Sequence, residues 1–310
     1  MNKISIIGAG MTGATAAHWL AERELADLVL VDVVEGLPQG KALDMLEAMP
    51  IVNTDVEIFG SNDYAATKDS DIVIITAGLP RKPGMSRDDL LKVNAEIVGK
   101  AATETLKYSP DAIFVVLTNP LDTMAYLAMK MTKLPRNRVI GQAGILDSAR
   151  MRAFVALETG VSVENINCYV LGGHGDEMVP LTRHSNIAGV PLKDYIPADK
   201  LEAIVNRTRK GGGEIVNLLK TSAYYAPAAA CAQMAEAILK NKNLIVPCAA
   251  YMDGEYGLKD MFFGVPVMLG RNGMEKIVEY SLDETEKAMF EKSAAAVKET
   301  HDALKNLVSF

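Results

Sequence analysis

Short apolar runs alternate with longer amphipathic segments through the first half of the chain. The runs are continuous and rich in Val and Ile, which is typical of strands that are covered on both faces of a sheet. They lie at residues 4–7, 28–31, 56–59, 72–75, 113–117 and 139–140. The segments between them predict helices at residues 11–24, 40–49, 88–107 and 122–131. Strands that alternate with helices in this way predict the α/β class, with a doubly wound parallel sheet.

The second half mixes helical and strand patterns in a different order, which is typical of an α+β domain. Helices are predicted at residues 147–159, 199–219, 227–240 and 283–308, and strands at residues 166–171, 244–252 and 262–269. We therefore expect two domains, residues 1–143 and residues 144–310. The sequence between them has no Pro/Ser-rich linker, which predicts that the two domains pack tightly against each other.

Composition narrows the range of partners. Among 310 residues, 39 acidic residues outnumber 32 basic ones, which gives a net charge of −7. An acidic surface repels phosphate polymers, so we expect no nucleic acid partner and no anionic membrane partner. The three cysteines are far apart, which suits a reducing compartment and matches neither a disulfide framework nor a metal site. No signal-peptide pattern and no run of 18 apolar residues is found, so a cytoplasmic location is expected.

A glycine-rich turn follows the first predicted strand and opens the first predicted helix. Its residues are Gly8, Ala9, Gly10, Met11, Thr12 and Gly13. The first Gly permits a tight turn, the second lets the backbone approach a pyrophosphate, and the third lets the helix pack closely on the strand. The phosphate then lies at the helix N-terminus, where free N–H groups favour anions. The turn therefore predicts a dinucleotide site, and a glycine turn without a ligand is the alternative, because such turns are common.

Two further segments bear on the cofactor. Asp32 follows the second apolar run, nineteen residues after Gly13, where a carboxylate can accept hydrogen bonds from an adenosine ribose. It would repel a 2′-phosphate and no Arg follows it, so the predicted cofactor is NAD rather than NADP. Thr76, Ala77 and Gly78 end the fourth apolar run. They predict a second approach to the cofactor, because open α/β sheets bind ligands at the carboxyl ends of their strands.

Among the four histidines of the chain, His174 has the surroundings of a catalytic residue. Three glycines flank it just after a predicted strand and leave space around an imidazole that exchanges a proton near neutral pH. His18, His184 and His301 lie in helix-like segments, and we interpret them as structural or solvated. The alternative for His174 is a buried side chain that serves only packing.

Asp147 and Arg150 are the expected partners of His174. Asp147 lies at a predicted helix start, and Arg150 follows three residues later on the same helix face. A carboxylate can orient an imidazole and stabilise its protonated form, and a guanidinium can bind a substrate carboxylate through two parallel hydrogen bonds. The alternative is a helix cap with an ordinary ion pair between residues three apart.

Cations also gather after the fourth apolar run, in the Pro- and Gly-rich residues 79–87. A solvated basic loop is one interpretation. The other is a lid that brings Arg81 and Arg87 over an anionic substrate and excludes water. Asn119-Pro120 follows the fifth run at the same edge of the sheet, and a cis bond there would direct the Asn side chain toward cofactor and substrate.

Taken together, these motifs resemble the lactate/malate dehydrogenase superfamily, and within it the malate dehydrogenases of the lactate dehydrogenase-like group. The resemblance covers essentially the whole chain and is carried by the segments 8–13, 80–87, 119–122, 146–150, 173–176 and 262–266. It implies a Rossmann-type NAD-binding domain followed by a catalytic domain. It also implies that His174 exchanges the proton, Asp147 orients it, Arg150 binds the substrate carboxylate and Arg87 polarises the carbonyl.

The resemblance further implies the substrate. Lactate dehydrogenases typically have a neutral Gln where this chain has Arg81, and an Arg there calls for a second carboxylate, as in malate or oxaloacetate. A desolvated Arg left unpaired costs several kcal/mol, roughly, so it would also reject a monocarboxylate. The expected activity is the reversible oxidation of (S)-malate to oxaloacetate with NAD. An L-lactate dehydrogenase, a noncatalytic NAD-binding module and an NAD-dependent glycosidase are the alternatives.

The same resemblance implies that Asn94 contacts the cofactor and that Leu117 and Asn119 lie where cofactor and substrate meet. It implies a homotetramer built as a dimer of dimers, and no metal. The chain departs from the family pattern at one place, because Lys220 and Thr221 precede Ser222 where a Gly is expected. This departure bears on the shape of the substrate pocket.

Overall fold

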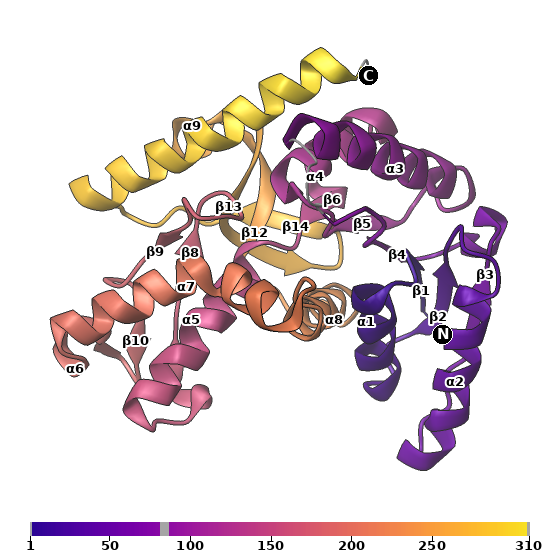
Figure 1. The fold of residues 1–310 in the computed structure, drawn as a ribbon, viewed down its shortest axis with the longest axis horizontal. Helices are drawn as coiled ribbons and strands as arrows, with labels where there is room; N and C mark the ends of the chain where they lie inside the picture. Colours follow the sequence, from indigo (N-terminus) through magenta and orange to yellow (C-terminus); the bar gives the residue numbers. More distant parts are fainter. Residues whose placement is uncertain (1, 81–86, 309–310) are drawn as a thin grey trace.

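A large twisted sheet forms the centre of the computed structural model, which describes residues 2–80 and 87–308. Within these residues, nine strands pair in the order β14-β13-β12-β6-β5-β4-β1-β2-β3 (Figure 1). Six of them are parallel, as predicted, and β12 to β14 extend the sheet as antiparallel strands. The strands are β1 Lys3–Ile7, β2 Asp27–Val31, β3 Ile58–Ser61, β4 Ile72–Ile75, β5 Ile113–Val116, β6 Val139–Gly141, β12 Leu244–Asp253, β13 Lys259–Gly270 and β14 Gly273–Ile277.

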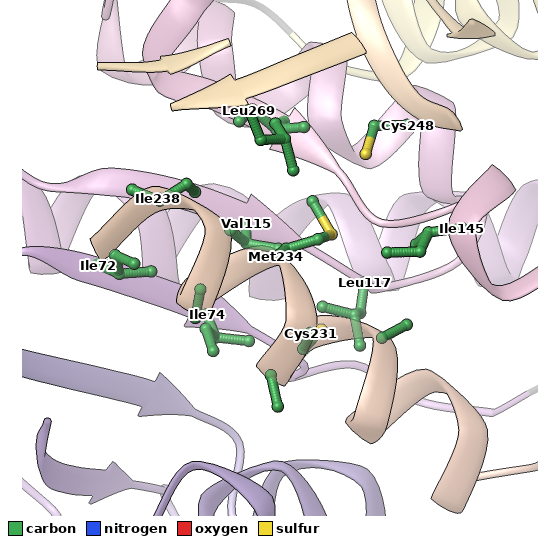
Figure 2. Packing of buried hydrophobic residues seen from close by; sticks show 14 of the residues in the cluster. Ile72, Ile74, Val115, Leu117, Ile145, Cys231, Met234, Ile238, Cys248 and Leu269 are labelled. Carbon is green, nitrogen blue, oxygen red and sulfur yellow. The ribbon is translucent and has the colours of Figure 1, made fainter. Parts of the chain in front are cut away.

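Helices cover both faces of this sheet, which explains why the parallel strands are mostly apolar. On β4, Ile72 and Ile74 belong to a core formed with α8, whereas Val73 and Ile75 belong to a core formed with α3 and α4. Figure 2 shows the first core, where Ile72 and Ile74 lie close to Ile238 of α8. The helices are α1 Met11–Glu22, α2 Leu37–Val52, α3 Arg87–Tyr108, α4 Leu121–Thr132, α5 Gly144–Thr159, α6 Leu192–Tyr195, α7 Ala198–Leu219, α8 Tyr225–Leu239 and α9 Glu284–Leu307.

The predicted strand at residues 166–171 is wrong as a single element. It divides into β7 (Ile166–Asn167) and β8 (Val170–Leu171), which pair in different small sheets, β7 with β10 (Asn186–Ile187) and β8 with β9 (Val179–Pro180). The helix-like stretch around His184 is a turn between β9 and β10. Strands of two residues are too short to show a period, so the sequence pattern could not resolve them.

Other differences concern element ends, the edge strand β14 and two short elements that were not predicted, β11 (Val190–Pro191) and α6. Helix α2 begins at Leu37 rather than residue 40, and α5 begins at Gly144 rather than Asp147. Strand β3 is shifted two residues along the chain from its predicted position. Strand β14 was not predicted, because as an edge strand it carries the polar pair Glu275 and Lys276.

The predicted domain boundary at residues 143/144 lies just after β6. The large sheet crosses it, because Ala249 of β12 pairs with Gly141 of β6. No helix within the described residues is long and apolar enough to cross a bilayer.

Candidate active site

Except for Asn94, which lies on α3, the predicted cofactor residues lie at the carboxyl ends of the parallel strands. The glycine turn follows β1, Asp32 follows β2, Thr76 follows β4 and Asn119 comes three residues after β5. Helix α5, which carries Asp147 and Arg150, begins after β6. The parallel topology thus brings to one edge of the sheet residues that are more than 100 positions apart in the sequence.

The glycine turn has the geometry that a pyrophosphate requires. Gly8 has φ +105°, and a Cβ on it would lie 2.7 Å from the Thr76 hydroxyl oxygen. A Cβ on Gly13 would collide with the carbonyl of Gly8, so the third glycine permits the close packing of α1 on β1. A Cβ on Gly10 would meet no described atom within 4 Å outside the adjoining backbone, and this N-cap of α1 has no side-chain cap. The helix N-terminus is therefore open to an anion, and the residues present fit a dinucleotide.

Asp32 is held in place by the backbone. Its Oδ2 accepts a hydrogen bond from the N–H of Ala9 at 2.7 Å, and its Oδ1 accepts one from the N–H of Val34 at 3.0 Å. A carboxylate can accept about four hydrogen bonds, so lone pairs remain for ribose hydroxyls. The bond from Ala9 connects Asp32 to the glycine turn, and the two bonds together fix the orientation of its carboxylate.

Thr76 and Asn94 connect, through hydrogen bonds, the loops near which the cofactor is predicted to bind. The Thr76 hydroxyl donates to the carbonyl of Gly8 at 2.9 Å. The amide of Asn94 accepts from the N–H of Leu79 at 2.8 Å and donates to the carbonyl of Asn119 at 2.8 Å. Asn94 is buried, so the structure shows it as a bridge between these two loops. Its predicted contact with the cofactor, like those of Ala77, Gly78 and Leu117, stays a prediction.

His174, Asp147 and Arg150 meet through one buried carboxylate. Oδ2 of Asp147 lies 2.8 Å from Nδ1 of His174, and Oδ1 accepts a hydrogen bond from Nη1 of Arg150 at 3.2 Å. Asp147 does not cap α5, because the N-cap position is Ala143 and Asp147 lies in the first turn. The capping alternative is therefore wrong, and Asp147 connects the imidazole to the guanidinium.

The environment of His174 favours its protonated form. Burial lowers the pKa of the imidazole, but the charge and the hydrogen bond of Asp147 raise it, and the resulting pKa lies above its ordinary value. A cavity of about 520 Å³ borders His174 and includes Asn119 on its wall. The Asn119-Pro120 bond is cis, as the sequence interpretation anticipated.

Arg150 lies against α7 with one edge of its guanidinium unused. Its Nη1 donates to Asp147 and to the carbonyl of Thr208 at 3.3 Å. Nε and Nη2 have no acceptor within residues 2–80 and 87–308, so this edge can take a carboxylate. Gly211 of α7 faces the same side chain, and a Cβ on Gly211 would lie 2.6 Å from Nε of Arg150.

The other histidines have no such constellation. His301 is buried, donates from Nδ1 to the carbonyl of Val297, and burial lowers its pKa to about 4. His184 stacks on Tyr280, and His18 is exposed on α1. Arg81 and the side chain of Arg87 lie outside the described residues, so their predicted roles stay predictions.

Comparison with known proteins decides the family. A family model described as lactate/malate dehydrogenase, NAD binding domain, matches residues 2–141, and one described as lactate/malate dehydrogenase, alpha/beta C-terminal domain, matches residues 145–308. The chain belongs to the lactate/malate dehydrogenase family. A relative in Roseiflexus castenholzii named malate dehydrogenase is 57% identical over 98% of this chain and 99% of its own length.

Solved structures of family members have the same fold. Malate dehydrogenase from Salinibacter ruber is 50% identical, covers 98% of both chains and has a TM-score of 0.95. A lactate dehydrogenase from Cryptosporidium parvum, solved with lactic acid and nicotinamide adenine dinucleotide, is 42% identical over 98% of both chains, with a TM-score of 0.95. Solved malate and lactate dehydrogenases of the family therefore share this architecture.

The departure from the lactate/malate dehydrogenase pattern lies at the end of α7. Lys220 is the C-cap of this helix and has φ 59° and ψ 14°, a left-handed conformation that Gly adopts more easily. Lys220 and Thr221 are exposed, and the chain continues through Ser222 into α8.

Sequence reasoning missed three residues that the structure places around this site, namely Asp122, Gly211 and Ser293. Asp122 occurs in the motif at residues 119–122 but looks like an ordinary acidic residue in the first turn of a helix. Gly211 begins a run of three glycines within α7, a pattern that indicates no function by itself. Nothing in the local sequence singles out Ser293.

Proposed function

We propose that the chain is an NAD-dependent malate dehydrogenase that reversibly oxidises (S)-malate to oxaloacetate, with His174 as proton acceptor and donor. The observation that carries the proposal is the single carboxylate of Asp147, which contacts both His174 and Arg150 at the edge where the dinucleotide turn lies. Relatives named malate dehydrogenase, 55–58% identical over nearly the whole chain, support the substrate.

Each residue of the site has a separate role in the proposed reaction. Arg150 binds the carboxylate next to the reacting carbon through its unused Nε and Nη2 edge. Asp147 accepts a hydrogen bond from Nδ1–H of His174, which leaves Nε2 as the acceptor for the malate hydroxyl proton. The glycine turn and Asp32 would hold NAD, whose nicotinamide ring would supply the acceptor for the hydride of malate. Arg87 polarises the carbonyl, Arg81 pairs with the second carboxylate, and both close over the substrate. In the reverse direction, protonated His174 donates its proton to the carbonyl oxygen of oxaloacetate.

The carboxylate of Asp32 is proposed to select NAD over NADP. We expect kcat/KM to be at least about tenfold higher with NADH than with NADPH, because the 2′-phosphate would meet an oriented negative charge. Steady-state reduction of oxaloacetate with each cofactor measures the ratio. Equal use of the two cofactors would contradict the role of Asp32.

Gly211 is proposed to leave the space that Arg150 needs. The variant Gly211→Ala places a methyl group against Arg150, so the guanidinium must shift and KM for oxaloacetate should rise about fivefold or more, with NADH affinity unchanged. Gly212→Ala is the matched control, because no described atom lies within 4 Å of its Cβ, and it should stabilise α7 by about 1 kcal/mol at unchanged KM. Equal KM values in the two variants would refute this role of Gly211.

Turnover separates the proposed enzyme from a noncatalytic NAD-binding module. With purified protein, NAD and (S)-malate, we expect NADH to appear, and its absorbance gives the rate. Tight binding of NADH without any turnover would instead support the binding module.

We further propose a homotetramer, built as a dimer of dimers, in the cytoplasm, with two domains that divide at residues 143/144. Self-association is supported by apolar side chains that lie exposed on α2, including Leu43, Leu46 and Val52. Sedimentation equilibrium should give four times the chain mass of 33.4 kDa. A monomer at micromolar concentration would contradict the tetramer.

A further inference from the structure

The backbone around His174 is anchored residue by residue to separate elements. The N–H of Gly172 donates to the carbonyl of Gly264 on β13 at 2.8 Å, and the N–H of Gly173 donates to the hydroxyl of Ser293 on α9 at 3.0 Å. The N–H of His174 donates to Oδ2 of Asp122 on α4 at 2.9 Å. Together with the Asp147 bond from α5, these contacts fix both the backbone and the ring of His174.

Asp122 differs from the other backbone anchors because it is a buried carboxylate. Its residue is 6% exposed, and its Oδ1 is buried without a hydrogen-bond partner in the part of the chain that the structure describes. Burial raises the pKa of Asp122 to about 6, against the lowering effects of the His174 N–H and the His174 charge. At pH 7 and above Asp122 is therefore mainly ionised. A neutral hydroxyl can accept a hydrogen bond from a backbone N–H, as the hydroxyl of Ser293 does from Gly173. Anchoring of the His174 backbone alone therefore does not explain why Asp122 carries a charge.

Besides anchoring the backbone, the carboxylate of Asp122 acts on the imidazole of His174 through its charge. The buried charged groups facing His174 are Asp147 and Arg150 on α5 and Asp122 on α4. When His174 is protonated, its charge and the charges of these three groups sum to zero. When His174 is neutral, the sum is one negative charge. Asp122 thus raises the pKa of His174 in addition to Asp147. The remaining carboxylates of the cavity wall are Asp88, Asp176, Glu177 and Glu299.

We propose that Asp122 is a positioning residue for His174, which anchors the His174 backbone through Oδ2 and stabilises the imidazolium through its charge. The proposal rests on the proposed function, since it assigns Asp122 a role in that same proton transfer. It adds to Asp147 on α5 a second electrostatic partner, which is contributed by α4, the helix that follows the Asn119-Pro120 turn.

Three variants separate the two roles in full-length protein. Asp122→Asn keeps an oxygen acceptor for the His174 N–H and removes the charge. Ser293→Ala removes the neighbouring neutral anchor and keeps the charge. Glu299→Gln is the matched control, because it removes a carboxylate from the wall of the same cavity without a bond to the loop. For each variant, kcat and KM for oxaloacetate reduction are measured from about pH 6.5, the ordinary pKa of an imidazole, upward to about pH 9.5, because the pKa of His174 is raised. Thermal unfolding is the check of folding.

Oxaloacetate reduction needs protonated His174, so its rate falls as the pH rises through the pKa of that residue. Asp122→Asn should move this fall to lower pH by about half a unit. Ser293→Ala should lower kcat about threefold or more at an unchanged pH profile, and Glu299→Gln should change neither quantity. A fourth variant, Asp122→Leu, should lower kcat and move the profile together.

A pH profile of folded Asp122→Asn that coincides with the wild-type profile overturns the electrostatic role. Wild-type kcat in folded Asp122→Leu overturns the anchoring role. If the wild-type protein itself does not reduce oxaloacetate, the proposed function fails. The His174 pKa can then still be compared between wild type and Asp122→Asn by NMR titration, and equal pKa values overturn the inference independently.

Discussion

Replacement of His174 by Asn is expected to lower kcat for oxaloacetate reduction about 100-fold or more, while NADH affinity stays at the wild-type level. Asn can keep a hydrogen bond to Asp147 but cannot release a proton to the carbonyl oxygen near neutral pH. NADH binding does not need that proton, so fluorescence titration of NADH should give the same Kd. The rate loss is therefore confined to the chemical step.

The control for this prediction is His184→Asn. His184 stacks on Tyr280 and contacts the carbonyl of Ser281, away from Asp147 and Arg150. This variant should keep wild-type kcat. Turnover near the wild-type rate in His174→Asn would remove His174 from the mechanism and return it to a packing role.

Replacement of Arg81 by Gln should shift the substrate preference from oxaloacetate toward pyruvate at least about tenfold, measured as the ratio of the two kcat/KM values. The expectation follows from charge: an Arg in a closed site pairs with a second carboxylate, and left unpaired it costs several kcal/mol, roughly. Removing the cation weakens binding of oxaloacetate and removes the penalty against a methyl group.

Lys82→Gln is the matched control, because it removes one positive charge from the next position of the same segment. If overall attraction of a dianion explained the preference, both variants would change the ratio equally. An unchanged ratio in Arg81→Gln would refute the assignment of specificity to Arg81.

The first half of the fold could be predicted because its strands are buried on both faces. Alternate residues of β4 enter different cores, so the run 72–75 is apolar throughout and stands out in the sequence. The small sheets of the second half could not be predicted, since β8 has two residues and depends on its partner β9. A pairing of this kind is decided by tertiary contacts rather than by a local pattern.

Some residues of the candidate site could likewise be predicted from the sequence, and others could not. His174 could be predicted because the glycines around it leave space beside the imidazole, and Asp147 and Arg150 because their spacing places them on one helix face. Asp122 could not, because an acidic residue in the first turn of a helix is common and its bond to His174 spans 52 positions. Gly211 could not, since only the folded structure shows that Arg150 lies against it.

The oxidation of NADH with oxaloacetate and with pyruvate, at matched concentrations in separate cuvettes, tests the central claim most directly. The proposed malate dehydrogenase activity predicts rapid loss of NADH with oxaloacetate and little with pyruvate. A preference for pyruvate would contradict the substrate and make the chain a lactate dehydrogenase with the same His174 and Asp147 chemistry. No loss with either substrate would contradict the proposed activity itself.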